Sequence, residues 1–250
     1  MDLRLQGRTA LVTGGASRVG REIAVALAAE GAAVAVNYRS SAEEANAIVS
    51  EITEGGGKAV AIAADVADLQ AVKAMVSRTV DELGGLDVLV NNAGLALRRP
   101  FVETTPDEWT RQIDVCLYGA IHCCHAAAPY LVKSGRGRII SIVGDSSRVG
   151  ESGLSIVAAA RAGTIALMKS LARELGRSGV TANTLSLGLI ETEHDKAWVD
   201  ANREKLVKLY PVRRLGQAQD VAPLAVLLAS DHAGWITGQA ISVSGGFSMI

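Results

Sequence analysis

A glycine-rich segment near the start of the chain has the residue types that bind phosphate groups. Residues Thr13 to Gly20 read TGGASRVG and lie between a short apolar run and a helical pattern. A turn in that position offers free backbone N–H groups and the positive end of a helix dipole to the pyrophosphate of a dinucleotide. Glycine also suits any tight connection from a strand to a helix, so the order of strand, turn and helix supports a binding site more than the glycines do.

The end of the next apolar run bears on which nicotinamide dinucleotide would bind. Residues 36–41 read VNYRSS and contain no carboxylate that could hold the ribose hydroxyls of NAD. Arg39, followed by Ser40 and Ser41, suits the 2′-phosphate of NADP instead. The sequence therefore predicts NADP(H) in preference to NAD(H), the alternative being that Arg39 is a solvated loop arginine.

The elements that would position these residues follow from short apolar runs alternating with helical patterns of about 10 to 20 residues. The alternation predicts an α/β fold: a single Rossmann-type, doubly wound domain over residues 1–250, with a seven-stranded, mainly parallel sheet and helices on both faces. A chain of 250 residues accommodates one such domain. The predicted strands are residues 9–13, 33–38, 59–64, 87–91, 138–143, 180–185 and 240–243.

Two long helices are predicted in the second half of the chain. Thr105, Pro106 and Glu108 supply an N-cap hydroxyl, a proline at the first helical position and a carboxylate at the third, so a helix should begin there and continue to about residue 131. A second helix is expected over residues 154–175. Its apolar surface exceeds what packing on one side requires, which favours burial against another subunit.

Composition and charge exclude several classes of protein. Twenty-five basic and 26 acidic residues give a net charge of −1, and the basic residues are scattered, so a nucleic-acid partner is not expected. The longest nearly apolar stretch, residues 23–36, is interrupted by Glu30 and is too short to span a membrane. The N-terminus lacks a signal-like apolar core, and Cys116, Cys123 and Cys124 are expected to be free thiols, so a cytoplasmic location is predicted.

Several motifs resemble, in order, those of the short-chain dehydrogenase/reductase family over essentially the whole chain. The turn at Thr13 to Gly20 is similar to the family's T-G-x-x-x-G-x-G, Asp65-Val66 to its adenine-side pair, residues 91–94 (NNAG) to its N-N-A-G strand end, and Gly188 with Thr192 to its nicotinamide-side loop. Arg18 stands at the middle glycine position, a variant similar to that of pteridine reductases. It would either add a cation beside the phosphates or obstruct the turn.

The resemblance implies a nicotinamide dinucleotide site, a substrate lid over about residues 192–211, and a homotetramer or dimer. The cofactor-binding residues that it implies are Gly14, Ser17, Arg18, Val19, Gly20, Tyr38, Arg39, Ser40, Asp65, Val66, Asn92, Ala93, Gly94, Arg161, Gly188, Ile190 and Thr192.

The catalytic positions depart from the family's pattern of Asn, Ser, Tyr and Lys, with Tyr and Lys in a Y-x-x-x-K motif. The aligned positions are Cys116, Gly144, Val157 and Arg161. No tyrosine in the chain is followed four residues later by lysine. Because valine has no proton to give, loss of the general acid should lower the rate of carbonyl reduction by about 10²- to 10⁴-fold.

Other side chains near the inferred cleft are possible substitutes. Asp145, Ser146, His194 and Tyr210 are candidates for proton transfer, each with the alternative of being an ordinary loop or core residue. Arg161 could bind ribose hydroxyls or an anionic substrate, or pair with a neighbouring charge as a structural residue.

A zinc site is not expected at residues 122–125, which read HCCH. Four successive helical residues fan out by about 100° each and cannot converge on one tetrahedral ion.

Three hypotheses of function follow. The first is an NADP(H)-binding protein without ordinary carbonyl reduction, acting as a binding or regulatory module or as the inactive partner of an active relative. The second is an enzyme of non-standard chemistry, either reducing an iminium, quinone or activated alkene with NADPH or using the pocket for a non-redox reaction. The third is a carbonyl reductase rescued by Tyr210 or His194. The substrate itself has no signature in the sequence.

Overall fold

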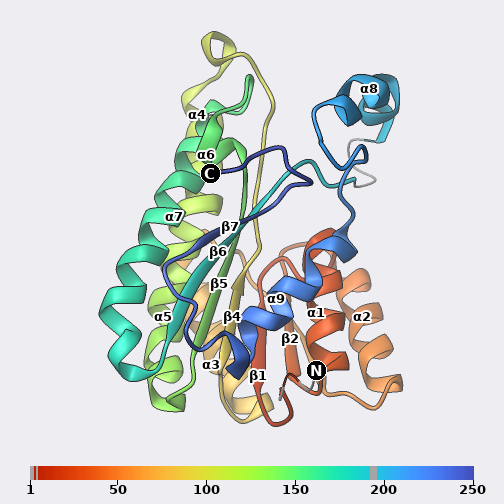
Figure 1. Cartoon of the computed structure of the whole chain (residues 1–250). Coiled ribbons are helices and arrows are strands. Elements are labelled where there is room, and N and C mark those ends of the chain that lie inside the picture. Colours follow the sequence, from red (N-terminus) through yellow and green to blue (C-terminus); the bar gives the residue numbers. More distant parts are fainter. Residues whose placement is uncertain (1–2, 4, 192–195) are drawn as a thin grey trace.

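The computed structural model describes residues 3, 5–191 and 196–250, and these form a three-layer α/β fold (Figure 1). Within them lies one seven-stranded sheet in the order β3-β2-β1-β4-β5-β6-β7, with every adjacent pair parallel. The predicted doubly wound fold is confirmed, and the sheet is parallel throughout. The strands are β1 Thr9–Val12, β2 Ala33–Tyr38, β3 Ala59–Ala63, β4 Val88–Asn91, β5 Arg138–Gly144, β6 Thr181–Leu187 and β7 Ala240–Val243.

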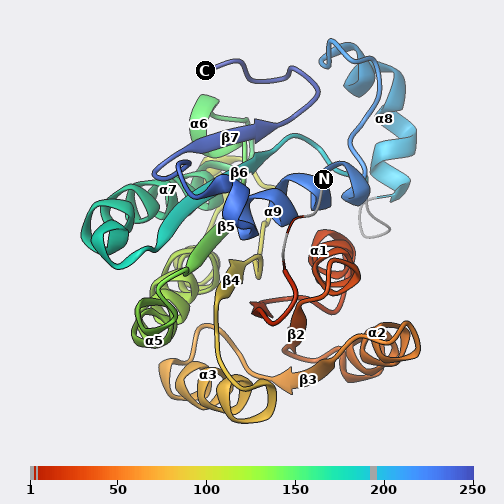
Figure 2. The ribbon, with the colours of Figure 1, turned by 60° about the horizontal axis from the view of Figure 1, so that its bottom comes forward.

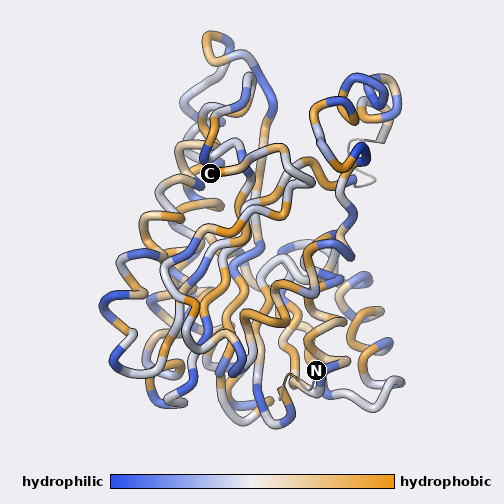
Figure 3. The backbone as a smooth tube through the Cα atoms, in the orientation of Figure 1, coloured by the Kyte–Doolittle hydropathy of each residue, from blue (hydrophilic) through white to orange (hydrophobic). Residues whose placement is uncertain are grey.

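Helices cover both faces of the sheet (Figure 2). One layer contains α1 Arg18–Ala29, α2 Ala42–Glu54 and α9 Ala222–Ala229, and the other contains α3 Leu69–Leu83, α5 Gly119–Ser134 and α7 Ser155–Leu175. Each layer has its own apolar core against the sheet, and Figure 3 shows hydrophobic residues along the strands and the sheet-facing sides of these helices. The remaining helical elements are η1 Phe101–Glu103, α4 Pro106–Ile113, η2 Asp114–Tyr118, α6 Ser146–Val149, η3 Gly176–Ser178, α8 Lys196–Lys208, η5 Ala218–Asp220 and η6 Asp231–Ala233.

The predicted helix start at Thr105 is confirmed, but the single helix expected to follow it is interrupted. Thr105 and Glu108 form a reciprocal capping box with Pro106 at the first helical position. Helix α4 then widens into one π-helical turn, η2, before α5 begins. The hydroxyl of Thr164 on α7 donates to the Cys116 carbonyl at 3.0 Å, which satisfies an acceptor in the widened turn.

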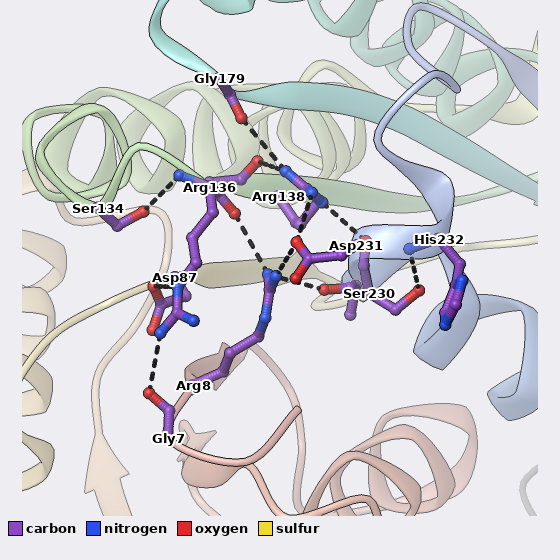
Figure 4. Close-up of polar contacts among 12 residues, drawn as sticks. Gly7, Arg8, Asp87, Ser134, Arg136, Arg138, Gly179, Ser230, Asp231 and His232 are labelled. Atoms are coloured by element: carbon purple, nitrogen blue, oxygen red, sulfur yellow. Dashed lines mark hydrogen bonds and ion pairs between the residues drawn. The ribbon is translucent and has the colours of Figure 1, made fainter. Parts of the chain in front are cut away.

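A network of charged side chains joins the strands at the end of the sheet where β1 and β5 begin (Figure 4). The fully buried Arg8 pairs with Asp231, and Arg138 approaches the same carboxylate at 3.4 Å. Asp87 accepts a hydrogen bond from Nε of Arg136 at 3.0 Å and another from the Thr9 backbone N–H at 2.9 Å. The network thus connects the segment before β1, the start of β5 and η6.

Two helical stretches, Pro106–Ser134 and Ser155–Ser178, have the length and apolar composition of membrane-spanning helices. Both stretches include a helix, α5 or α7, that packs against the sheet. Core helices of soluble proteins can have the same length and apolar composition as a membrane span. The two stretches are therefore weak evidence for a membrane span.

Candidate functional site

The candidate site lies at the carboxyl ends of the strands, where the strand order reverses between β1 and β4. Loops diverge at such a switch point and leave a crevice for a ligand. Two adjoining cavities of about 390 and 200 Å³ lie there and share Gly14, Ser17, Ala93 and Gly94. They form one elongated cleft across the sheet edge.

The glycine turn is fixed to both neighbouring strands by side-chain hydrogen bonds. The Thr13 hydroxyl accepts from the backbone N–H groups of Asn92 and Ala93, each at 3.0 Å, and Nδ2 of Asn92 donates to the Thr13 and Gly14 carbonyls at 2.9 and 3.1 Å. Oδ1 of Asn37 on β2 accepts from the Gly14 N–H at 3.1 Å. The turn is therefore preorganised, and Asn37 is a contributor that sequence reasoning missed.

Close packing explains the glycines at positions 14 and 20. Gly14 has φ +58°, and a Cβ there would lie 3.1 Å from Cα of Ala93. A Cβ on Gly20 would lie 2.4 Å from the Gly14 carbonyl oxygen. No larger residue can occupy position 20 without moving the turn, so the first residues of α1 lie directly behind it.

Arg18 begins α1 in the left-handed conformation, with φ +54°. Its side chain is exposed and lines the larger cavity, so it does not fold back into the turn. Among the described residues it has no ion-pair partner. Of the two possibilities raised by the sequence, this geometry favours a cation beside the phosphates.

The smaller cavity contains the residues predicted to select the cofactor. Tyr38, Arg39 and Ser40 line it, together with Asp65 and Val66 at the end of β3. Arg39 is exposed. Oδ1 of Asp65 accepts the Ala67 N–H at 3.0 Å, which turns that carboxylate oxygen toward its own loop.

The four positions aligned with the family's catalytic residues lie close together but divide into two pairs. Val157 and Cys116 are buried with Ala160 in a small apolar cluster and do not line either cavity. The Cys116 thiol donates to the Leu95 carbonyl and accepts from its N–H, each at 3.3 Å. Position 157 therefore presents no proton donor to the cleft.

Arg161 and Gly144 form the other pair, and both line the larger cavity. A Cβ added to Gly144 would lie 3.1 Å from Nη1 of Arg161, and one added to Gly94 would lie 2.9 Å from Nη2. The guanidinium thus occupies a slot between two residues that have no side chain. In the described part of the chain it has no hydrogen-bond or ion-pair partner.

Three of the candidate substitutes also reach the larger cavity. Asp145 is 1% exposed, and its Oδ1 accepts from the hydroxyls of Ser186 and Ser242 at 2.5 and 3.0 Å, while Ser146 adjoins it. The Tyr210 hydroxyl accepts the Leu189 N–H at 2.9 Å. Burial raises the pKa of Tyr210, which makes its phenol a weaker acid. His194 and Thr192 lie outside the described residues.

Comparison with known proteins decides the family. Residues 14–248 match a family model described as enoyl-(acyl carrier protein) reductase. The 3-oxoacyl-[acyl-carrier-protein] reductase FabG of Staphylococcus aureus is 42% identical over 97% of this chain and 98% of its own length. The chain belongs to the short-chain dehydrogenase/reductase family. This confirms the resemblance drawn from the motifs and makes the protein a member of an oxidoreductase family.

Solved structures of short-chain dehydrogenase/reductase proteins agree with this assignment. A gluconate 5-dehydrogenase from Burkholderia cenocepacia, in complex with NADP and tartrate, is 33% identical with a TM-score of 0.93, and the match covers 98% of this chain and 97% of that one. A blue fluorescent protein from a metagenomic library, in complex with NADPH, is 35% identical with a TM-score of 0.92 over 98% and 99% of the two chains. Relatives with nicotinamide cofactors thus share the whole fold.

The structure brings together the cofactor-binding residues that membership of the short-chain dehydrogenase/reductase family implies. Every one of them that lies within the described residues lines one of the two cavities. Sequence reasoning missed Arg98, Glu151 and Phe247 in the same lining. Arg98 pairs with Glu151 at 2.5 Å and lies 5.4 Å from the ring centroid of Trp198 on α8. No local pattern could find these residues, because three separate loops supply them.

Residues 122–125 do not converge on a common point: His122 is half-buried, Cys123 and Cys124 are buried, and His125 is exposed. Nδ1 of His122 lies 3.0 Å from the Val66 carbonyl. Cys123 and Cys124 are buried, and burial raises the pKa of Cys124 to about 12, so its thiol stays protonated. The described residues contain no group of three or more metal-ligand side chains arranged to hold an ion.

Proposed function

We propose that this protein binds NADP(H) in the cleft and does not reduce ordinary ketones at a rate comparable with that of its active relatives. The observation that carries the second part is position 157, where a buried valine packs against Cys116 and provides no hydroxyl at the position of the family's tyrosine. A ketone accepts a hydride efficiently only when a donor protonates its oxygen or stabilises the developing negative charge. Arg161 retains a positive charge at every useful pH and cannot readily give up a proton.

The residues of the cleft fit NADP(H). The cavity beside Gly14 and the start of α1 has room for a pyrophosphate, and Arg18 adds a cation there. The exposed Arg39, with Ser40 and Ser41, lines the adenosine end and suits a 2′-phosphate. When bound, the cofactor would supply a hydride, while these side chains would bind and orient it.

Calorimetric titration with NADPH, and separately with NADH, tests the cofactor. We expect NADPH to bind about tenfold or more tightly than NADH, and Arg39→Gln to remove most of that difference. Arg78→Gln on α3, another exposed arginine, is the matched control and should leave both affinities unchanged. Equal affinity for the two cofactors in the wild-type protein would refute the preference.

Carbonyl reduction is tested separately with NADPH and a panel of ketones, including a 3-oxoacyl thioester. We expect turnover about 10²-fold or more below that of a relative with an intact Tyr and Lys pair. Turnover at the relative's rate would refute the proposal and direct attention to Tyr210 and His194, through Tyr210→Phe and His194→Ala.

A second candidate function is hydride transfer to an acceptor that needs no protein proton, such as an iminium, a quinone or an activated alkene. The continuity of the cofactor cleft with the larger cavity favours it, because an acceptor there would lie beside the nicotinamide end. Stereospecific, protein-dependent oxidation of NADPH by any such acceptor would establish this function. A panel without turnover, with NADPH bound, would leave a binding or regulatory role.

The proposal also covers assembly and location. We propose a single domain over residues 1–250 with a lid at 192–211, part of which is α8, and a cytoplasmic homodimer or homotetramer built through α4, α5 and α7. Mixed assembly with an active relative belongs to the same hypothesis. The exposed apolar residues of α5 and the exposed alanines of α7 support it.

A further inference from the structure

Arg161 carries a charge that the cofactor-binding hypothesis does not require, because the ribose hydroxyls that it could bind are neutral. Its side chain is half-buried and lines the larger cavity. Within the described residues it has neither an acceptor nor a carboxylate partner. Partly desolvating an unpaired guanidinium costs free energy, and a bound anion would recover that cost.

The other charged groups of the cavity are paired, buried within the protein or located at its phosphate end. Arg98 is neutralised by Glu151 at 2.5 Å. Asp145 is 1% exposed; its Oδ1 receives hydroxyl hydrogen bonds from β6 and β7, its Oδ2 has no hydrogen-bond partner, and no ion pair joins it to Arg161 among the described residues. Arg18 lies at the start of α1, beside the expected pyrophosphate. The cation available to an anion in the inner part of the cavity is therefore Arg161, which has no partner among the described residues.

The geometry of the slot favours a planar anion with two oxygens. Nη1 faces Gly144 at the end of β5, and Nη2 faces Gly94 beyond β4, so the two nitrogens are held side by side between backbone segments. A carboxylate matches this fork with two parallel hydrogen bonds. The cavity of about 390 Å³ must also hold the nicotinamide half of the cofactor, so the second ligand is small.

Apolar side chains complete the cavity beside the guanidinium. Leu154 and Leu189 line it, as do the rings of Tyr210 and Phe247, which stack with their centroids 5.5 Å apart. These surfaces suit the carbon body of a ligand rather than a second charge. We propose that the cavity binds a small carboxylate with a short apolar body, held by Arg161 beside the bound cofactor. This inference rests on the NADP(H) site proposed above.

The test is calorimetric titration of the NADP⁺-saturated protein with matched pairs of ligands: pyruvate and pyruvamide, succinate and succinamide, benzoate and benzamide. At least one carboxylate should bind about tenfold or more tightly than its neutral amide. Arg161→Gln should remove that preference. Gly144→Ala, which keeps the charge but crowds Nη1, should weaken carboxylate binding about threefold or more. Arg78→Gln on α3 removes the same charge outside both cavities and should change carboxylate affinity less than threefold.

The outcomes separate this inference from the cofactor proposal. If NADP⁺ does not saturate the protein, the proposed function fails, and the same titrations on the cofactor-free protein still decide whether Arg161 selects carboxylates. If NADP⁺ binds but no carboxylate is preferred over its amide, the inference is wrong while the cofactor site stands. Equal losses of carboxylate affinity in Arg161→Gln and Arg78→Gln would overturn the inference in favour of diffuse electrostatic attraction. Loss of NADP⁺ affinity in Arg161→Gln, with carboxylate binding intact, would assign Arg161 to the nicotinamide ribose.

Discussion

At the scale of single residues, Arg161 and Gly144 depend on each other. The guanidinium lies where a side chain at position 144 would project, since a Cβ there would be 3.1 Å from Nη1. Restoring a serine at position 144 alone therefore crowds Nη1, and the guanidinium has to move by a few tenths of an ångström to accommodate it. A shorter, unforked ammonium at position 161 would relieve this crowding. The two departures from the family's pattern are physically coupled.

A double-mutant cycle on the free energy of urea unfolding measures this coupling. Gly144→Ser should destabilise the wild-type protein by about 1 to 2 kcal/mol, and it should cost about 1 kcal/mol less in an Arg161→Lys background. Gly85→Ser is the control, because a Cβ at Gly85 meets no atom within 4 Å. Strict additivity of Gly144→Ser and Arg161→Lys would contradict the steric account.

Arg18 has an unfavourable backbone conformation, and we expect its charge to offset that cost by strengthening cofactor binding. Its φ of +54° lies in the left-handed region, where a side chain costs roughly 1 to 2 kcal/mol relative to glycine. Arg18→Gly should raise the free energy of unfolding of the cofactor-free protein by about 1 kcal/mol and weaken NADPH binding about tenfold. Arg213→Gly, at φ +59° outside the two cofactor cavities, should stabilise similarly without affecting NADPH. Unchanged NADPH affinity in Arg18→Gly would show that the arginine is not a phosphate ligand.

At the scale of elements, the charged network around Asp231 holds η6 against the starts of β1 and β5 (Figure 4). Burial alone would raise the pKa of Asp231, but the guanidinium groups of Arg8 and Arg138 outweigh it and hold the pKa below its ordinary value. A carboxyl whose pKa is depressed in the folded protein stabilises the fold above its unfolded pKa of about 3.9. That contribution disappears as the pH falls from there through the folded pKa.

Asp231→Asn tests the network by leaving Arg8 buried without a counter-charge. At pH 7 we expect a loss of about 2 kcal/mol, less than for a fully buried pair because the Asp231 side chain is 51% exposed. Below about pH 4 the difference from the wild type should narrow, because the wild type then loses the same interaction. Asp81→Asn on α3 is the surface control. A difference that stays constant between pH 7 and pH 3 would show that charge is not its cause.

The elements also show which parts of the structure the sequence could predict. Apolar strands and capped helices carry local signals, so seven strands and the helix start at Thr105 were predictable. The π-helical turn η2 was not, because its released carbonyl is satisfied by Thr164, 48 positions along the chain from Cys116. The glycine turn was recognisable from its motif, whereas Asn37 and the pair of Arg98 with Glu151 reach the site only through tertiary packing. Motifs located the site, and long-range contacts determine its shape.

At the scale of the whole molecule, the outer face of α7 is unusually suited to close helix contact. Ala159, Ala162 and Ala166 are exposed and recur at helical spacing, so another helix could approach the backbone closely. Beside it, α5 and the turn before it expose Tyr118 by 51% and Ile121 by 36%. Small and apolar residues on two adjacent helices are typical of a subunit interface rather than of a solvated surface.

Ala166→Glu tests this face, because a carboxylate there costs little in a monomer but would be buried without a partner in an assembly. We expect light scattering after size-exclusion chromatography to give a dimer or tetramer for the wild type and a smaller species for Ala166→Glu, with the far-ultraviolet circular dichroism of the two proteins alike. Ala47→Glu places the same change on an exposed position of α2, in the opposite layer, and should leave the assembly intact. Since α7 also carries Arg161, the same variant tests whether the cleft depends on the assembly. A wild-type molar mass for Ala166→Glu would exclude this face as the interface. If the variant does dissociate, NADPH titration shows whether the cleft requires the assembly. An unchanged NADPH affinity would mean that each subunit binds the cofactor independently.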